Sequence, residues 1–463
     1  MPRGNPAEYG LDGERLGAGM DRAFAAAIKD KQLSGGVALV LRRGHVVFEK
    51  AYGYRCIIGT TEPATLDTIY DVASLTKPVA TASAIMKLVE QGRIRLRDGV
   101  KTYIPEWKND KDADERTSEA TRLKRYIRTG ALRPSIDLLQ STKSLDGASL
   151  PNSPGELWHR MVSAGHVRLD ETFIEQALRF DGIQREGVQL RHLLTHTSGL
   201  DPFDRYYLRW PERAARTRII ADIVQRKLVN PPGEAFIYSD LGFITLGEIV
   251  ERVTSKTLAQ FTHDEIFGPL GMRDTMFNPP GELLPRIAPT EWRESVTTIT
   301  GTDDAPTTAS VKTMIRGEVH DGNAYVQDGI SGHAGLFSTA RDLAIFCQML
   351  LKGGEHADVR IFSPLTVIAM STDQAQLKTD DQRGYGWDIK TSYSGPRGDI
   401  FTTGFGHTGW TGTSIWIVPE EQIAIIILTN RVHPDGTGDA TPLRSKIANV
   451  VAGSILKEKN LPQ

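Results

Sequence analysis

The amino-acid sequence predicts a mixed α/β (α+β) fold. In this fold an antiparallel sheet built from both termini is flanked by helices and carries an inserted, mainly helical lobe. Two hairpin patterns support the prediction: VALVLRRGHVVFEKAYGYR near the start of the chain and GTSIWIVPEEQIAIIILTNRV near its end. The sequence between them shows mostly helical patterns. Because strands from both ends need partners, we expect them to pair in one sheet.

The elements of this fold can be placed in chain order. The first is a helix, predicted by apolar residues that recur every four positions: Leu16, Met20, Phe24 and Ile28. We expect Gly35-Gly36 to end it. The first hairpin then turns near Gly44, and the second turns around Pro419-Glu420. A closing helix is predicted for LRSKIANVVAGSILKE.

Two structural units are expected. Residues 1–72 and 295–463 would form the sheet domain, and residues 73–294 would form the helical lobe. The lobe includes a predicted insertion at about 107–187, because KNDKDADERTSEATRLKRYIR is dense in mixed charge and poor in core residues. Two interpretations of the insertion stay open: a solvated surface excursion, or a cap over a substrate cleft.

Composition excludes several classes of partner. The chain has 463 residues, 40% hydrophobic and 24% charged, which suits a large core divided among two or more lobes. A net charge of -2 gives no field that would gather nucleic acid or an anionic membrane. The longest apolar run, IAIIIL, has the length of a buried strand and not of a membrane span. The sequence leaves the oligomeric state open.

Targeting signals and cysteines add little. The start, MPRGNPAEYGLDGERLG, has no apolar signal-peptide core, so we expect a cytoplasmic protein as written, or a periplasmic or secreted one if a leader was removed. Cys56 and Cys347 could form one disulfide, but two buried thiols are favoured. His320, Asp321 and His333 match no metal motif and are expected to order a loop near the cleft, so no metal is predicted.

Two further polar motifs are predicted to be structural. His196, in THTSGL, is expected to lie at a helix end. Thr339 with Asp342 fits a capping box before LAIFCQMLL.

The stretch GFGHTGWTG (404–412) begins with a G-x-G-x-x-G pattern. A dinucleotide site needs that pattern between a strand and a helix, so that the helix N-terminus meets the pyrophosphate. Here a hairpin pattern follows instead. No cofactor is therefore predicted, and the glycines are expected to let a strand edge run close to another segment.

A nucleophile is indicated by Ser74 and Lys77, which form S-x-x-K at the head of a predicted helix. Pro78 is tolerated only in the first turn of a helix, which places Ser74 at its N-terminus. Lys77 then lies one turn away on the same face. A serine hydroxyl becomes a good nucleophile when a neighbouring base takes its proton. A second match, Ser454 to Lys457, lies in the predicted closing helix with no partner motif after it.

Two later motifs could complete such a site. Tyr238-Ser239-Asp240 directly precedes an amphipathic pattern. A lone tyrosine is most often a packing residue, but beside a lysine its pKa can be drawn down so that it acts as a general base. His407-Thr408-Gly409 heads a strand whose backbone N–H groups could meet a substrate carbonyl. The order S-x-x-K, Y-x-[ND], [KH]-T-G is closely related to that of penicillin-recognising enzymes.

With these motifs the chain resembles the serine β-lactamase-like superfamily, which includes class C β-lactamases, D-alanyl-D-alanine peptidases and family VIII carboxylesterases. Further segments resemble that family in the family's order: LRHLLTHTSGLDPF, IFGPLGMRDTMFNP, GEVHDGNAYVQDGISGHAGLFSTARDLAIF and GYGWDI. The resemblance covers roughly 10–107 and 188–457. It implies a β-lactamase/transpeptidase-like fold and an acyl-enzyme mechanism.

The resemblance also implies roles for individual residues. Ser74 would be the nucleophile, Lys77 the proton relay and Tyr238 the general base. The oxyanion hole would consist of the backbone N–H groups of Ser74 and Trp410. The implied substrate-binding residues are Asp240, His407, Thr408 and Gly409.

Two positions depart from the family's commonest pattern. Asp240 stands where asparagine is usual, and His407 stands where lysine is usual in β-lactamases. Asp240 could pair with Lys77 and hold it charged, which would leave the role of base to Tyr238. We therefore expect a serine hydrolase for a small ester or amide, with short-chain carboxylic esters as the leading substrates. The alternatives are a D-alanyl-D-alanine carboxypeptidase or β-lactamase-like amide hydrolase, and a non-catalytic binding protein on the same fold.

Overall fold

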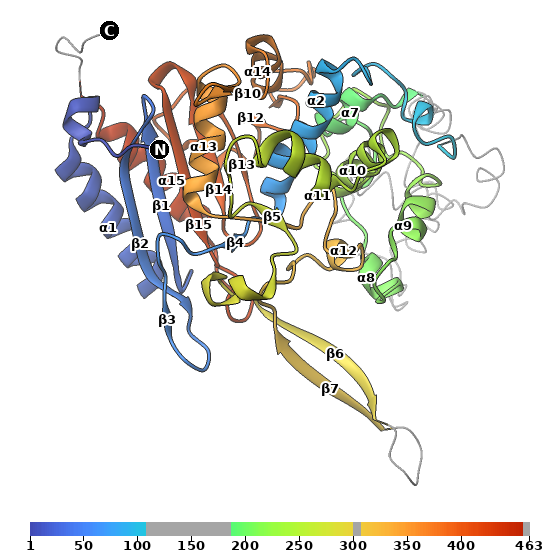
Figure 1. Cartoon of the computed structure of the whole chain (residues 1–463), viewed down its shortest axis with the longest axis horizontal. Coiled ribbons are helices and arrows are strands. Elements are labelled where there is room, and N and C mark those ends of the chain that lie inside the picture. Colours follow the sequence, from blue (N-terminus) through green and yellow to red (C-terminus); the bar gives the residue numbers. More distant parts are fainter. Residues whose placement is uncertain (108–186, 300–306, 457–463) are drawn as a thin grey trace, which may run out of the picture.

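The structure is a computed structural model that describes residues 1–107, 187–299 and 307–456. Figure 1 shows a sheet with helices on both faces and a mainly helical lobe beside it. The predicted insertion at 107–187 lies, apart from its two end positions, outside the described residues. Both interpretations of that segment therefore stay predictions.

The main sheet has eight strands in the order β11-β12-β13-β14-β15-β1-β2-β3, and each neighbouring pair is antiparallel. Its strands are β1 (Gly35–Arg42), β2 (His45–Cys56), β3 (Glu62–Pro63), β11 (Gln382–Arg383), β12 (Asp388–Lys390), β13 (Phe405–Thr408), β14 (Ser414–Val418) and β15 (Ile423–Thr429). β1 pairs with β15 from Gly36–Thr429 to Arg42–Ile423. The two ends of the chain therefore meet in one sheet, which confirms the predicted fold class.

Strands β1 and β15 are buried along their whole length. Successive side chains of a strand point to opposite faces. In β1, Val37 and Leu39 belong to the larger core, whereas Ala38 and Val40 face the smaller core formed with the terminal helices. The apolar run IAIIIL is β15, and its composition follows from burial on both faces.

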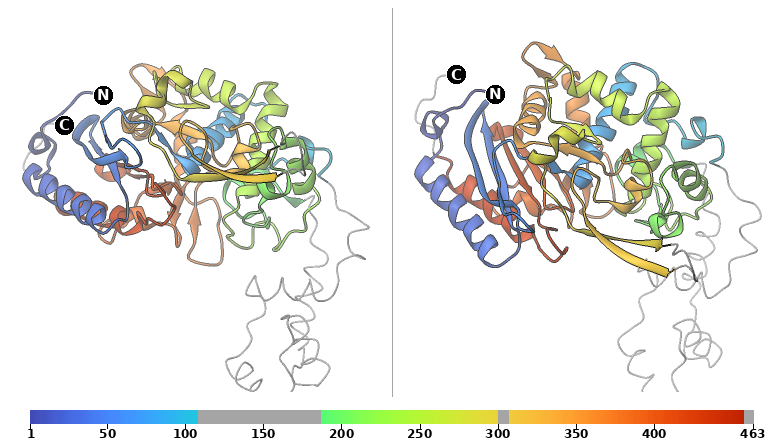
Figure 2. Two further views of the ribbon diagram at one scale, coloured as in Figure 1. Left: turned by 90° about the horizontal axis from the view of Figure 1, so that it is seen from below. Right: turned by 60° about the horizontal axis from the view of Figure 1, so that its bottom comes forward.

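Helices cover both faces of this sheet. α1 (Gly13–Lys29) and α15 (Thr441–Gly453) lie together on one face, and α13 (Ala340–Leu351) packs against β1 and β15 on the other (Figures 1 and 2). Asp12 caps α1 by accepting a hydrogen bond from the Arg15 N–H. The expectation that Gly35-Gly36 end this helix is wrong, because both glycines lie in β1. A Cβ on Gly35 would stand 2.4 Å from the Tyr54 nitrogen.

The remaining elements lie outside the main sheet and the three helices that cover it. The other helices are α2 (Ser83–Glu90), α7 (Leu190–Leu194), α8 (Tyr206–Arg209), α9 (Arg216–Ile223), α10 (Asp240–Thr254), α11 (Leu258–Thr262), α12 (Gly322–Tyr325) and α14 (Pro364–Ser371). The other strands are β4 (Tyr70–Asp71), β5 (Met276–Phe277), β6 (Trp292–Ile299), β7 (Thr307–Met314), β8 (Leu336–Ser338), β9 (Glu355–His356) and β10 (Val359–Arg360). The β6–β7 hairpin projects from the body of the molecule (Figure 1).

Several smaller predictions can be compared with the structure. Cys56 and Cys347 are both free and buried, as favoured from the sequence. Thr339 caps α13 by accepting a hydrogen bond from the Asp342 N–H, but the predicted capping box is only half formed, because the Asp342 carboxylate accepts from the Asp274 N–H instead of reaching back to Thr339. In the described part of the chain, no helix is both long and apolar enough to cross a membrane. The boundaries of the two predicted units remain a prediction.

Candidate active site

Ser74 lies on a tight turn at the start of a long helical segment. The turn is a 3₁₀ helix, Ala73–Leu75, and it continues through a π-helical stretch, Lys77–Ala82, into α2. The plain helix start expected from the sequence is therefore wrong in detail, although Ser74 does precede the helix. Ala73 has a φ of 47°, which is costly for a residue with a side chain. The Ala73 N–H donates to Asp71 Oδ1 at 2.8 Å, which helps to hold this strained turn.

Lys77 is completely buried and faces Ser74. Its Nζ donates to Ser74 Oγ at 2.9 Å and to the His333 carbonyl at 3.1 Å, and it forms an ion pair with Asp240 Oδ1 at 2.7 Å. Burial alone would lower the pKa of Lys77, but the charges of Asp240 and Tyr238 outweigh it and raise that pKa above its ordinary value. This direction favours an ammonium group at Lys77, which donates hydrogen bonds to Ser74 Oγ and to the His333 carbonyl.

Tyr238 is half-buried beside this pair, just before α10. Lys77 Nζ stands 4.9 Å from the centre of its ring. His196 supports the other side of Tyr238: the two rings stack with centroids 4.4 Å apart. The His196 carbonyl accepts from the Ile237 N–H, and His196 Nδ1 accepts from the Ser239 N–H. The predicted structural histidine thus holds the backbone amides of the residues just before and just after Tyr238.

His407 lies at the end of β13 with its ring 5.9 Å from that of Tyr238. Its Nδ1 lies 2.8 Å from the Thr408 carbonyl, an arrangement in which Nδ1 carries the proton and donates it. Burial, together with the positive charges of Arg383 and Lys77, lowers the pKa of His407 well below its ordinary value. His407 is therefore neutral at physiological pH.

The glycine-rich stretch forms β13 and the turn that leads into β14. A Cβ on Gly409 would lie 2.1 Å from Thr413 Oγ1 and 2.5 Å from the Val72 carbonyl, so only glycine fits there. Thr411 and Thr413 donate from their hydroxyl groups to the carbonyls of Asp71 and Val72, at 2.7 and 3.0 Å. These contacts place the turn against the segment that precedes Ser74, and they account for the glycine pattern by close backbone approach.

Trp410 follows in the same turn. Its side chain is 66% exposed, and the Arg431 guanidinium lies 4.4 Å from the centre of the ring. Within the described ranges, the Trp410 N–H has no hydrogen-bond acceptor. The Gly409 carbonyl, which belongs to the same peptide unit as the Trp410 N–H, accepts a hydrogen bond from Arg444 Nη2 at 2.8 Å.

A family model described as "Beta-lactamase" matches residues 20–122 and 156–449. The chain belongs to the β-lactamase family. The match omits residues 123–155, which fall inside the predicted insertion. With this family match, and with relatives named as a carboxypeptidase and a hydrolase, the chain is a serine hydrolase.

Individual relatives differ in their reported activities. The β-lactamase-family chain is 29% identical over 416 residues to a protein of Salmonella agona (strain SL483) named as a candidate D-alanyl-D-alanine carboxypeptidase, which covers 85% of this chain and 78% of the other. Its fold is similar to that of EstCE1, "a hydrolase with promiscuous acyltransferase activity", with a TM-score of 0.62, 18% identity and coverage of 95% and 99%. It is also similar to a penicillin-binding protein homologue from Caulobacter crescentus, with a TM-score of 0.59, 17% identity and coverage of 95% and 97%.

The histidines of the 320–333 loop in this β-lactamase-family chain hold the loop against the site. His320 donates its N–H to Asp71 Oδ2 at 2.7 Å, and its ring lies 2.7 Å from Glu291 Oε1. His333 Nε2 lies 2.9 Å from Asp321 Oδ1, and the His333 carbonyl accepts from Lys77. Among the described residues, no group of three potential ligands could hold a metal ion.

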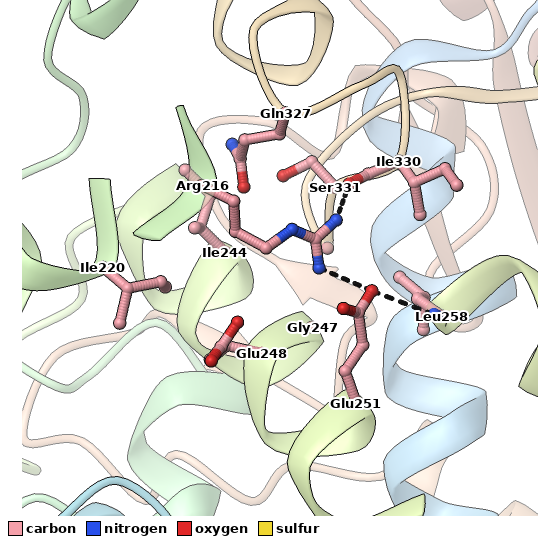
Figure 3. Close-up of a pocket in the computed structure, with 11 residues that line it drawn as sticks. Arg216, Ile220, Ile244, Gly247, Glu248, Glu251, Leu258, Gln327, Ile330 and Ser331 are labelled. Atoms are coloured by element: carbon pink, nitrogen blue, oxygen red, sulfur yellow. Dashed lines mark hydrogen bonds and ion pairs between the residues drawn. The ribbon is translucent and has the colours of Figure 1, made fainter. Parts of the chain in front are cut away.

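A pocket elsewhere in the lobe is separate from these groups (Figure 3). Arg216 fills much of it, donating to the Ile330 carbonyl and forming an ion pair with Glu251 at 2.5 Å. The lining includes Gly332 but none of Ser74, Lys77 or Tyr238. Because Arg216, Glu248 and Glu251 are already in ion pairs, we assign this pocket a structural role.

Two arginines near the site of this β-lactamase-family chain were missed from the sequence. Arg383 is fully buried, and none of its guanidinium nitrogens has a hydrogen-bond partner in the described part of the chain. Its Cζ lies 5.5 Å from the Phe236 ring, and its Nη1 lies 3.4 Å from Asp388 Oδ1. Arg444, on α15, reaches the turn after β13. Neither belongs to a local motif, so no pattern in the sequence pointed to them.

Proposed function

We propose that this serine hydrolase is a carboxylesterase for uncharged, short-chain esters that acts through an acyl-enzyme on Ser74. The observation that carries the proposal is the charge balance around Ser74. Lys77 is neutralised by Asp240 at 2.7 Å, and His407 is neutral because of its burial. A free carboxylate next to the scissile bond would therefore meet little positive charge.

Arg316, a further cation to consider for binding a substrate carboxylate, is already occupied. Arg316 binds both carboxylate oxygens of Glu62 at 2.7 Å, so its charge is already paired. The exposed side chains that flank the reacting groups are aromatic: Tyr393, 47% exposed and 5.1 Å from the Tyr238 ring, and Trp410. Aromatic surfaces favour an apolar acyl or alkoxy group.

The proposed reaction assigns one task to each group. Tyr238, as the phenolate stabilised by the Lys77 ammonium, accepts the Ser74 proton while Ser74 Oγ attacks the ester carbonyl. The N–H groups of Ser74 and Trp410 would stabilise the oxyanion. Tyr238 returns the proton to the departing alkoxide, and the same groups then activate water to release the acid.

A D-alanyl-D-alanine carboxypeptidase is the second candidate. It is favoured by the name of the Salmonella relative, which covers most of both chains. An ester has the better leaving group, so a modest base and oxyanion hole suffice for it. The peptide also brings a carboxylate, which Lys77, neutralised by Asp240, and the neutral His407 would attract only weakly.

The test compares kcat/KM for p-nitrophenyl butyrate, a D-Ala-D-Ala peptide and a chromogenic cephalosporin at pH 6 and pH 8. We expect the ester to be the best substrate at both values. Ser74→Ala should abolish turnover and labelling by a fluorophosphonate probe, and Ser454→Ala, at the second S-x-x-K match, should leave both unchanged. Equal or better turnover of the carboxylate-bearing substrates at pH 8 would refute the ester preference.

A further inference from the structure

Arg444 is a buried cation that binds only backbone carbonyls of the turn after β13. It projects from α15 and is 8% exposed. Its Nη2 donates to the Gly409 carbonyl at 2.8 Å and to the Thr413 carbonyl at 3.0 Å. Within the described residues, no carboxylate lies within ion-pair distance of it. A buried charge without a carboxylate partner costs free energy, so the presence of an arginine at this position needs an explanation.

The two carbonyls that Arg444 binds also close the turn. The Gly409 N–H donates to the Thr413 carbonyl at 2.7 Å, and the Gly412 N–H donates to the Gly409 carbonyl at 3.0 Å. On its other side the turn is held by the hydroxyl of Thr413, which donates to the Val72 carbonyl. The turn is therefore held between Arg444 and the segment that leads to Ser74.

The contact between Arg444 and the Gly409 carbonyl also restricts the direction of the Trp410 N–H. The Gly409–Trp410 peptide is trans, so its C=O and N–H point in opposite directions. Since Arg444 holds the C=O, the Trp410 N–H points away from Arg444, and it has no acceptor among the described residues. A charged donor on the carbonyl also polarises the peptide unit and strengthens its N–H as a donor.

We propose that Arg444 is a positioning residue for the oxyanion hole, which orients and polarises the Gly409–Trp410 peptide so that the Trp410 N–H meets the developing oxyanion. The proposal rests on the acyl-enzyme mechanism above and extends it to a residue on the C-terminal helix. Ester and amide carbonyls need the same stabilisation, so the role of Arg444 does not depend on which of them is the substrate.

Arg431 provides a matched control in the same turn. Its Nε donates to the carbonyl of Trp410, which belongs to the next peptide unit, and its Nη1 donates to the Gly438 carbonyl, both at 2.6 Å. Arg431→Met therefore removes a cation-to-carbonyl contact one peptide away from the proposed oxyanion donor, although Arg431 is less buried than Arg444.

The experiment measures kcat, KM and the inhibition constant of an alkyl trifluoromethyl ketone, which forms a tetrahedral adduct. For Arg444→Met we expect a kcat about 10²-fold lower with KM nearly unchanged, as for loss of an oxyanion donor, whereas Arg431→Met should change kcat by less than about threefold. The ketone should lose affinity in proportion to kcat/KM. Arg444→Lys, which keeps the charge and a donor, should recover part of the loss.

Three results would overturn the proposal. These are a kcat within about twofold of the wild type in folded Arg444→Met, an equal loss in Arg431→Met, and ketone binding unaffected by Arg444→Met. If Arg444→Met does not fold, the ratio of ketone affinity to KM in Arg444→Lys decides. A wild type that hydrolyses the peptide and not the ester refutes the proposed substrate only, and the same comparison on the peptide still tests Arg444.

Discussion

The charge state of Lys77 decides which side chain is the base. Its buried ammonium is held by Asp240, a residue that the family's usual pattern replaces with asparagine. The ion pair that the sequence suggested between these residues is present in the structure at 2.7 Å. We propose that Lys77, with its proton retained, orients Ser74 and stabilises a phenolate on Tyr238, and that the tyrosine takes the role of base.

Replacing the tyrosine tests this division of roles. Tyr238→Phe keeps the ring that stacks on His196 and removes the hydroxyl, so kcat should fall by about 10²–10⁴-fold while the fold persists. Tyr393→Phe is the matched control, since its ring lies 5.1 Å from that of Tyr238 and its hydroxyl has no proposed role in proton transfer. Stopped-flow or steady-state kinetics on p-nitrophenyl butyrate provide the measurement. Near-full activity in Tyr238→Phe would make Lys77 the base.

At the scale of elements, the site depends on how closely the turn after β13 approaches the Ser74 turn. The short residue patterns and their order along the chain were enough to locate the motifs that carry the proposed reacting groups. The contacts that hold those groups, from His196, His333 and Arg444, come from distant segments and have no local pattern. The 3₁₀ and π turns around Ser74 were also not predictable, because residue preferences do not distinguish them from an α-helix start.

Gly409 offers a test of this approach. Gly409→Ala would place a Cβ 2.5 Å from the Val72 carbonyl, which must move the turn away from Ser74. We expect a loss of kcat of at least about tenfold, since small misplacements of reacting groups are costly. Gly17→Ala is the control: no atom lies within 4 Å of its Cβ, and in the interior of α1 it should raise stability by about 0.5–1 kcal/mol without changing kcat. Equal kinetics in the two variants would contradict the argument.

Across the whole molecule, the pairing of β1 with β15 brings residues from both ends into one sheet. The alternation of the hairpins and the two-sided burial of IAIIIL were readable from sequence, so the fold class could be predicted. The placement of the helical lobe against the sheet depends on packing between helices of different segments. That placement could not be predicted from the sequence. The same packing buries titratable groups, which makes the stability of the whole protein depend on pH.

His192 shows the sign of this dependence. Burial and the charge of Arg191 lower the pKa of His192 to about 4, below its ordinary value of 6.5. Below pH 6.5 the unfolded chain binds a proton that the folded protein excludes, so stability present above pH 6.5 is lost as the pH falls toward 4. Burial lowers the pKa of His196 and His407 in the same direction. Asp342 opposes them, because burial raises its pKa to about 6 and the folded state then keeps a proton.

Burial also raises the pKa of Asp71, so three histidines act against two carboxyl groups, and we expect the free energy of unfolding to fall between pH 6.5 and pH 4. His192→Gln should make that slope shallower by up to about 1.4 kcal/mol per pH unit, because glutamine does not titrate. At pH 7 the variant should be nearly as stable as the wild type. Glutamine at this third helical position of α7 can still accept the Gln189 N–H, as His192 Nδ1 does at 3.2 Å. Urea unfolding at pH 7, 6 and 5 measures both slopes. Parallel slopes in the two proteins would show that His192 is protonated as readily in the folded state as in the unfolded chain.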